Sequence, residues 1–476
     1  MTHCLSSLLH QANAEVQMAV KTPAGLTDRQ TITDSVLQGD TWGSILASAQ
    51  VDSIGQECME AGHYYLYKDK LPVGFLGLVD DIVSISEAGY KAQQQNVFLN
   101  LKTAEKSLKF GVKKCKSLLI SKNKSDFYSD LMVDKWEVKY EDNPLTGDLD
   151  LVEEFCGQTR LERVDKQMYL GFVISSVGDN MANIEHVKNK SIGIVKKIFN
   201  KLNSLHLKQY YFECSKIFLN VLLRPSILYA SEAYYNLKES EIRQLERIEE
   251  NFLRNILNTS KGCPIVQLYL ELGHIPARVE IQKIRLMYLQ YILHQSDESS
   301  LSQFFKLQFE SPTRGDWASR IIQDLKDWEI FENFEAIKVM SKNKFSNILK
   351  GKIRTISLKY LTNKQGKKGK DIKYSSLEMA DYLLPTNKHL NLEEKRTLFA
   401  LRNKMVDIPN SFSNKELKEK CFCGEIEEME HLYECEILGN NSEIPYDKIY
   451  SNNVKDQIEV FRRMEKKNDE RIGNTR

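Results

Sequence analysis

The sequence predicts a mixed α+β fold, with antiparallel strands in the first part of the chain and helices in the rest. Two apolar runs separated by turn residues, at 16–33 and again at 72–86, indicate hairpins. Farther along the chain, apolar residues recur every three or four positions at 184–202, 208–225 and 237–257. That spacing is typical of amphipathic helices, so we expect a small antiparallel sheet followed by a largely helical remainder.

The hairpin at 72–86 carries Asp80 and Asp81 at the point where the chain must reverse. We expect two buried strands, built from Leu76, Leu78, Val79, Ile82, Val83 and Ile85. Unpaired charges are costly beside buried strands, so two adjacent carboxylates at this tip favour a divalent metal as their partner. The alternative is an ordinary turn, because aspartate side chains readily bond to the backbone of turns.

Two helices are expected to flank this hairpin. The first runs from Thr41 to about Ala61, and we predict that it turns Ile45, Leu46, Ala49 and Ile54 inward. The second lies between Ala88 and Phe110 and ends at Gly111. Its apolar positions at helical spacing are Val97, Phe98, Leu101, Ala104 and Leu108.

The overall composition is that of a globular protein. The chain has 476 residues, 66 basic and 65 acidic residues, and 42% hydrophobic residues, enough for two or three folded units. Its nine cysteines do not resemble a secreted disulfide framework. With no apolar run long enough for a bilayer and no signal-peptide pattern, we expect a nuclear or cytoplasmic protein that binds no membrane.

Local charge is strongly uneven. Residues 103–124 hold seven lysines and one acid, 186–224 eight basic residues and one acid, and 336–374 twelve and one, whereas 134–154 hold eight acids and two lysines. Clustered Lys and Arg on helices, with tyrosines nearby, suit the phosphate backbone of nucleic acids. The competing interpretation is a solvated helix face.

Four short motifs, considered together with their order along the chain, are more informative than any one of them alone. They are Gln38-Gly39 within 36–44, Asp80-Asp81 in the hairpin, Lys114-Cys115 within 108–120, and Tyr169-Leu170-Gly171. This series resembles the reverse transcriptases of non-LTR (LINE-type) retrotransposons. Weaker matches to the C-terminal regions of these retroelements follow at 268–273, 315–317 and 390–402.

The resemblance implies an RNA-directed DNA polymerase, a nucleotidyltransferase that binds an RNA template, a DNA primer and deoxynucleoside triphosphates. It implies that Asp80 and Asp81 hold Mg²⁺ or Mn²⁺ for a two-metal mechanism. By the same resemblance, template and nucleotide contacts fall to Gln38, Gly39 and Ser44, and the primer grip to Tyr169, Leu170 and Gly171. Lys114 matches the proposed general acid for the leaving pyrophosphate, or is one more exposed lysine in a basic cluster.

The same resemblance implies three parts. Residues 1–175 would form a reverse-transcriptase palm remnant with antiparallel strands and helices, 176–300 a helical thumb, and 301–476 a helical C-terminal region with a small zinc knuckle. Independently of the resemblance, Cys421, Cys423, His431 and Cys435 stand within fifteen residues of one another. Three thiolates and an imidazole can close a tetrahedral Zn²⁺ site.

Two departures qualify the resemblance. Leu78 stands where the family usually has an aromatic residue, and nothing in residues 1–37 matches the strand that carries the family's third carboxylate. We therefore expect the fingers, the first palm strand and any endonuclease to be missing from this chain, and its polymerase activity alone to be impaired. The competing classes are a catalytically inactive nucleic-acid-binding retroelement remnant and a domesticated scaffold for protein partners.

Overall fold

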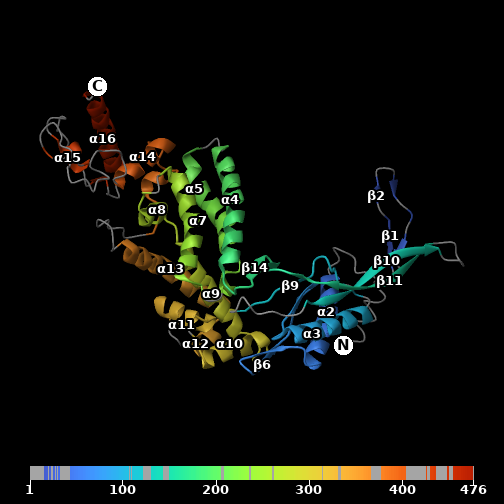
Figure 1. Ribbon diagram of the computed structural model, residues 1–476. Helices are drawn as coiled ribbons and strands as arrows, with labels where there is room; N and C mark the ends of the chain where they lie inside the picture. Colours follow the sequence, from blue (N-terminus) through green and yellow to red (C-terminus); the bar gives the residue numbers. More distant parts are fainter. Residues whose placement is uncertain are drawn as a thin grey trace. The chain divides into compact units, whose positions relative to one another are not determined.

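The computed structural model has the α+β composition that the sequence predicts, mostly helical with small antiparallel sheets (Figure 1). It divides into two units, residues 1–167 and 168–476, each described separately below. The structure describes residues 16–19, 21–22, 25–26, 28, 30–32, 43–106, 108, 110–121, 130–142, 149–204, 208–234, 237–259, 262–313, 315–330, 334–365, 377–403, 425, 429–435, 448–449 and 454–474. The predicted division at residues 175 and 300 stays a prediction.

The strands of the first unit pair as short antiparallel ribbons. The pairs are β1 (Val16–Met18) with β4 (Gln30–Ile32), β2 (Lys21–Thr22) with β3 (Gly25–Leu26), β5 (Tyr65–Tyr67) with β6 (Leu71–Val73), β7 (Phe75–Leu78) with β8 (Asp81–Ser84), and β10 (Met132–Asp142) with β11 (Leu149–Arg160). Two short strands, β9 (Lys116–Ser117) and β12 (Glu162–Arg163), pair in parallel. The predicted hairpins at 16–33 and 72–86 are confirmed, and the described residues of the acidic segment 134–154 lie in strands β10 and β11.

Helix α2 (Gly43–Glu60) forms where predicted but buries a different face. Ile54 is buried as expected, whereas Ile45 is 54% exposed and Ala49 is exposed too. The buried stripe begins later because the helix packs on β7. At Gly55 an added Cβ would lie 2.5 Å from the ring of Phe75, so only a glycine lets the strand approach this closely.

Helix α3 (Gly89–Glu105) is also rotated from its predicted face, and it ends at Glu105 rather than at Gly111. Val97 and Leu101 are more than half exposed, while Leu99 is buried beside two polar residues, Gln95 and Thr103. Phe98 and Leu108 pack only partly against the small core around Ile54 and Cys58. The apolar period placed the helix but not its face, because polar Gln95 has partners deep in the unit.

The second unit is helical apart from strand β14 and the end of β13. Its elements begin with β13 (Lys166–Tyr169), β14 (Phe172–Ser175), α4 (Met181–Asn203), η1 (Lys208–Tyr210), α5 (Tyr211–Phe218), η2 (Leu219–Leu223), α6 (Arg224–Ile227), η3 (Ser231–Ala233), α7 (Glu239–Leu257), α8 (Ile265–Leu272) and α9 (Ala277–Leu293). They continue with α10 (Ser300–Glu310), α11 (Trp317–Asp327), α12 (Phe334–Lys338), α13 (Lys342–Gln365), η4 (Asp381–Leu383), α14 (Leu392–Arg402), α15 (Met429–Glu434) and α16 (Val454–Asn474).

Helices α4 and α7 confirm the helical stripes read from the sequence. Ile184, Val187, Ile198 and Leu202 of α4 are buried, as are Leu245, Phe252 and Ile256 of α7. Val195 and Ile248 are partly buried against the same core. That core also receives side chains from α14 and α16, whereas a second core lies among α9, α11 and α13.

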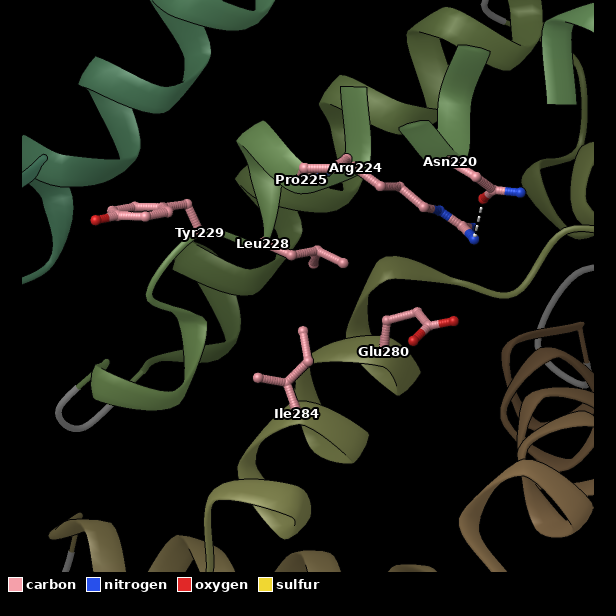
Figure 2. Close-up of a pocket in the computed structure, with 7 residues that line it drawn as sticks. All are labelled: Asn220, Arg224, Pro225, Leu228, Tyr229, Glu280 and Ile284. Atoms are coloured by element: carbon pink, nitrogen blue, oxygen red, sulfur yellow. Dashed lines mark hydrogen bonds between the residues drawn. The ribbon is translucent and has the colours of Figure 1, made fainter. Parts of the chain in front are cut away.

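Pro225 widens the predicted helix at 208–225 instead of ending it. Proline has no N–H to donate, and its ring clashes with the carbonyl four residues earlier, here that of Val221. The residues before Pro225 form a π-helical turn, η2, which avoids this clash. The α-helix then continues as α6, with Pro225 in its first turn. Arg224 and Tyr229 therefore leave this bend in different directions (Figure 2).

Candidate functional site

The hairpin tip between β7 and β8 is a two-residue turn. Leu78 pairs with Asp81, so Val79 and Asp80 form the turn itself. Val79 has a φ of +56°, the left-handed region that a β-branched residue rarely adopts. Such strain persists only where the surroundings hold it, and it is concentrated at functional sites. The structure thus places Asp80 in a strained turn and Asp81 directly after it, as the first residue of β8.

The strands behind these carboxylates are not buried, contrary to our expectation. Leu76 is 47% exposed and Leu78 is 52% exposed, and Asp81 is exposed as well. The opposite face explains this, because Phe75 and Gly77 turn toward α2, where an added Cβ at Gly77 would lie 2.8 Å from Val51. Among the residues described, this hairpin has one covered face, and its carboxylates are open to ligands from solvent.

Gln95 of α3 holds the base of the same hairpin. Its side-chain amide donates to the carbonyl of Gly74 at 2.8 Å and to that of His63 at 3.1 Å, while its carbonyl accepts from the Ser86 hydroxyl at 2.5 Å. Gly74 precedes β7 and Ser86 follows β8, so one buried amide ties both ends of the hairpin. The role of Gln95 was not predicted from the sequence. The one sequence feature that indicates its burial is its position on the same helix face as the apolar Leu99.

The other predicted polymerase residues of the first unit are less fully placed. Gln38 and Gly39 lie outside the described residues, and of Ser44 only the backbone, in the first turn of α2, is described. Lys114 is exposed in a turn before β9, where its N–H donates to the carbonyl of Gly111 at 2.7 Å. It lies in a turn rather than in the strand that we expected, because β9 begins only at Lys116.

The predicted primer-grip residues form a hairpin turn instead of one continuous strand. Tyr169 ends β13, and Leu170 and Gly171 make the turn with φ values of +47° and +79°. The Tyr229 hydroxyl donates to the Leu170 carbonyl at 2.5 Å, and an added Cβ at Gly171 would lie 3.2 Å from the Tyr229 ring. Tyr229, from the segment after Pro225, therefore clamps this turn.

Strand β14 is joined to α4 through Asn183. The Val173 N–H donates to the Asn183 side chain at 3.0 Å, and the Asn183 amide donates to the Tyr234 hydroxyl at 3.0 Å. All three residues are buried, and burial raises the pKa of Tyr234 to about 12. Tyr229 thus fixes the turn at Leu170–Gly171, and Asn183 fixes the strand that follows it to α4.

A hollow of about 340 Å³ opens beside the π-helical turn (Figure 2). Its lining consists of Asn220, Arg224, Pro225, Leu228, Tyr229, Glu280 and Ile284. The polar side chains are engaged by the protein itself: Arg224 donates to Asn220 at 2.9 Å, and Glu280 pairs with Lys283 at 2.9 Å. The hollow therefore has little polar capacity left for a ligand.

Arg224 is the centre of a buried polar contact. Its guanidinium bonds to Glu249 at 2.6 Å and to the carbonyl of Ile275, and Glu249 also accepts from the Tyr269 hydroxyl and the Ala277 N–H. Glu249 is 0% exposed. Burial raises the pKa of its carboxyl, and Arg224 opposes that rise. The charge pair joins the π-helical bend to α7, α8 and α9.

Two more carboxylates of α7, Glu246 and Glu250, are buried against α13. Tyr360 donates to Glu246 at 2.7 Å, and Lys364 lies 3.7 Å from Glu246 and 3.6 Å from Glu250. Burial acts to raise the pKa of Glu246, but Lys364 and the arginines nearby outweigh it, so the pKa is lowered. This carboxylate face of α7 was not predicted from the sequence.

Helix α4 turns a basic face outward. Its exposed lysines are Lys188, Lys190, Lys196, Lys197 and Lys201. None of them forms an ion pair with a carboxylate of the described residues. Gly193 lies among them, and an added Cβ there would meet no described atom within 4 Å. Residues nine positions apart lie on opposite sides of an α-helix, so Lys188 and Lys197 flank the exposed side and do not share one row. Five uncompensated cations spread over this side suit phosphates on both strands of a duplex.

The predicted zinc ligands are only partly described. Cys421 and Cys423 lie outside the described residues, whereas half-buried His431 and buried Cys435 stand four residues apart around α15. Within the described ranges, no group of three or more His, Cys, Asp or Glu side chains could hold a metal ion. The zinc site stays a prediction, and so does the magnesium site.

We predict that the purified chain contains one zinc ion per molecule, held by Cys421, Cys423, His431 and Cys435. Removing it with a chelator should increase hydrogen exchange within 415–440, because thiolate ligation couples the metal to local folding. Metal analysis of the chain and of Cys421→Ser tests this, with Cys214→Ser as the matched control. A Cys421→Ser variant with its full zinc content would contradict the prediction.

A comparison with protein-family models found no match, and a comparison with curated proteins found none either. No helix in the described part of the chain is long and apolar enough to cross a bilayer.

Proposed function

We propose that the chain is the RNA-directed DNA polymerase part of a non-LTR retrotransposon, with its activity impaired in this chain alone. The observation that carries the proposal is the β7–β8 turn, where Asp80 and Asp81 stand side by side on a hairpin that Gln95 anchors. The turn at Leu170–Gly171, clamped by Tyr229, and the lysine face of α4 support it.

The residues present fit a divalent metal in part. Two adjacent, accessible carboxylates supply the oxygen ligands that Mg²⁺ prefers, and the Val79 turn holds them at a fixed point. When bound there, the metal would lower the cost of forming the attacking primer oxygen and stabilise the leaving oxygen. In this proposal, Asp80 and Asp81 bind the ion, Gln38, Gly39 and Ser44 contact template and nucleotide, and Lys114 donates a proton to pyrophosphate.

The β14 hairpin would orient the primer end in the same reaction. The turn is rigid because Tyr229 bonds to Leu170 and packs on Gly171, while Asn183 joins the strand to α4. The α4 lysines would then hold the phosphates of the primer–template duplex. The turn at Leu170–Gly171 and the lysines of α4 would thus bind and orient one duplex at two points.

The metal site is tested by replacing Mg²⁺ with Fe²⁺ in the presence of ascorbate and peroxide, which cleaves the backbone next to a bound ion. We expect cleavage near residue 80, lost in Asp80→Asn and Asp81→Asn because one carboxylate cannot hold the ion alone. The exposed Asp52→Asn is the matched control from the same unit. Equal cleavage in all four proteins would contradict the site.

Extension of a DNA primer on an RNA template, with Mg²⁺ or Mn²⁺, is the companion assay for function. We expect little extension, because the sequence shows no match to the strand that carries the family's third carboxylate. Whatever extension occurs should disappear in Asp81→Asn and persist in Asp52→Asn. Robust extension that Asp80→Ala abolishes would show the chain to be active and confirm the site.

The second candidate function is nucleic-acid binding without catalysis, as in a retroelement remnant. The five uncompensated lysines of α4 favour it, since they need no metal site to act. Duplex binding with no metal-dependent cleavage at the β7–β8 turn would select this function over the first.

A further inference from the structure

Helix α13 presents a second basic face on the surface of the unit. Its exposed residues include Lys344, Asn347, Lys350, Gly351, Arg354 and Thr355, which recur every three or four positions. The opposite face buries Phe345, Leu349, Ile353 and Ile356 in the core shared with α9 and α11. The basic face therefore points away from the protein interior.

Two of its lysines have no anionic partner in the described part of the chain. Lys344 and Lys350 form no ion pair there, whereas Arg354 pairs with Glu378 at 3.0 Å in an exposed contact. Gly351 lies between them, and an added Cβ at this position would meet no described atom within 4 Å. A mid-helix glycine costs helix stability, and here no neighbouring side chain of the described residues requires it.

Helices α4 and α13 lie on different sides of α7 (Figure 1). Phe252 of α7 packs on Phe199 of α4, with ring centroids 5.5 Å apart, whereas Glu250 faces Lys364 of α13. Residues two positions apart on an α-helix point roughly 160° away from each other. Helices α4 and α13 therefore contact α7 on different sides, and we treat their exposed lysines as two separate surfaces.

We propose that α13 carries a second phosphate-binding site, separate from α4, so that one chain holds two nucleic-acid duplexes at once. Binding of a duplex at α4 rests on the proposed function, whereas binding of the second duplex is argued from the α13 face alone. Lys344, Lys350 and Arg354 contact phosphates, and Gly351 lets a sugar-phosphate backbone approach the helix closely. Thr355 and Asn347 donate hydrogen bonds at the edges of the same contact.

The exposed face of α13 favours a duplex over a single strand. Single-stranded nucleic acids are held by aromatic side chains that stack on the bases, and this face has none. The helix has 24 residues, so it is roughly 36 Å long, which suits the regular phosphate spacing of a duplex. The site is accordingly independent of base sequence.

A bridging assay tests the proposal with the full chain. A duplex attached to a surface is loaded with protein and then offered a second, fluorescent duplex of unrelated sequence. We expect capture by the wild type, and about 100-fold weaker capture by Lys344→Glu/Lys350→Glu at 0.1 M salt, since two phosphate contacts are lost. The matched control is Lys306→Glu/Lys388→Glu, which reverses two exposed lysines elsewhere in the unit.

Sedimentation of the mixture distinguishes one chain with two duplexes, which we expect, from a dimer with one duplex on each chain. The variant Gly351→Ala adds a second readout, because it should raise the melting temperature and still weaken capture. Bridging by Lys344→Glu/Lys350→Glu at wild-type strength, or complexes that always contain two chains, would overturn the proposal. A single duplex lost on changing α13 but not α4 would overturn the α4 site and, with it, the binding of two duplexes by one chain.

Discussion

Raising the salt concentration from 50 to 200 mM is expected to weaken duplex binding at α4 by about 500-fold, if its five exposed lysines each neutralise one phosphate. Each neutralised phosphate releases counterions, so the logarithm of the affinity falls linearly with the logarithm of the salt concentration. The dependence on base sequence should be slight, because contacts to phosphates carry no sequence information.

The measurement uses a labelled RNA–DNA duplex and the Lys344→Glu/Lys350→Glu background, so that α4 is the face tested. Replacing Lys196, Lys197 and Lys201 with alanine should reduce the salt slope by about 2.7, from three lost contacts. The control replaces the exposed Lys306, Lys326 and Lys388 instead. An unchanged slope in the α4 variant, or no binding of the background protein at low salt, would refute the α4 surface.

Glu249→Gln is expected to lower the free energy of unfolding of the helical unit by about 3–5 kcal/mol. The substitution keeps the shape of the side chain but leaves the charged Arg224 buried without its anion. The energy of such a pair resides in mutual neutralisation, so removing one partner costs more than removing both. Denaturant unfolding, followed by helical circular dichroism, measures the loss.

Two further variants give this prediction its controls. Glu239 is on the same helix as Glu249, is mostly exposed and pairs with Arg278 of α9. Glu239→Gln should therefore lower the free energy of unfolding by less than about 1 kcal/mol. Arg224→Met/Glu249→Leu removes the buried pair together and should recover much of the stability. If Glu249→Gln and Glu239→Gln lower the free energy of unfolding equally, the burial of Glu249 does not explain how much this carboxylate stabilises the helical unit.

The sequence analysis was most successful where one local pattern was enough. The helical period of α4 and α7 predicted the buried Ile184, Val187 and Phe252, because an amphipathic helix needs only its own spacing to define a face. The β7–β8 hairpin also followed from local signals, two apolar runs and an aspartate pair. Its strands proved to be covered on one face only, since burial depends on what packs against each face.

The faces of α2 and α3 could not be predicted from their own residues. Close approach at Gly55 and the hydrogen bonds of Gln95 selected a different stripe from the one that hydrophobicity indicated. A buried glutamine is invisible to an apolar pattern because its partners, the carbonyls of Gly74 and His63, are distant in the chain. Polar burial of this kind requires tertiary contacts to satisfy it.

Local sequence patterns were enough to predict the α+β class, the positions of the main hairpin and helices, and a chain reversal next to Asp80 and Asp81. The burial of Glu246, Glu249 and Glu250, and the contacts of α4 and α13 with different sides of α7, depend instead on how the helices pack. The two sets of features differ in the distance along the chain over which the interactions that create them act. Backbone propensity and periodicity act over a few residues, whereas a carboxylate can be buried only when distant cations and donors converge on it.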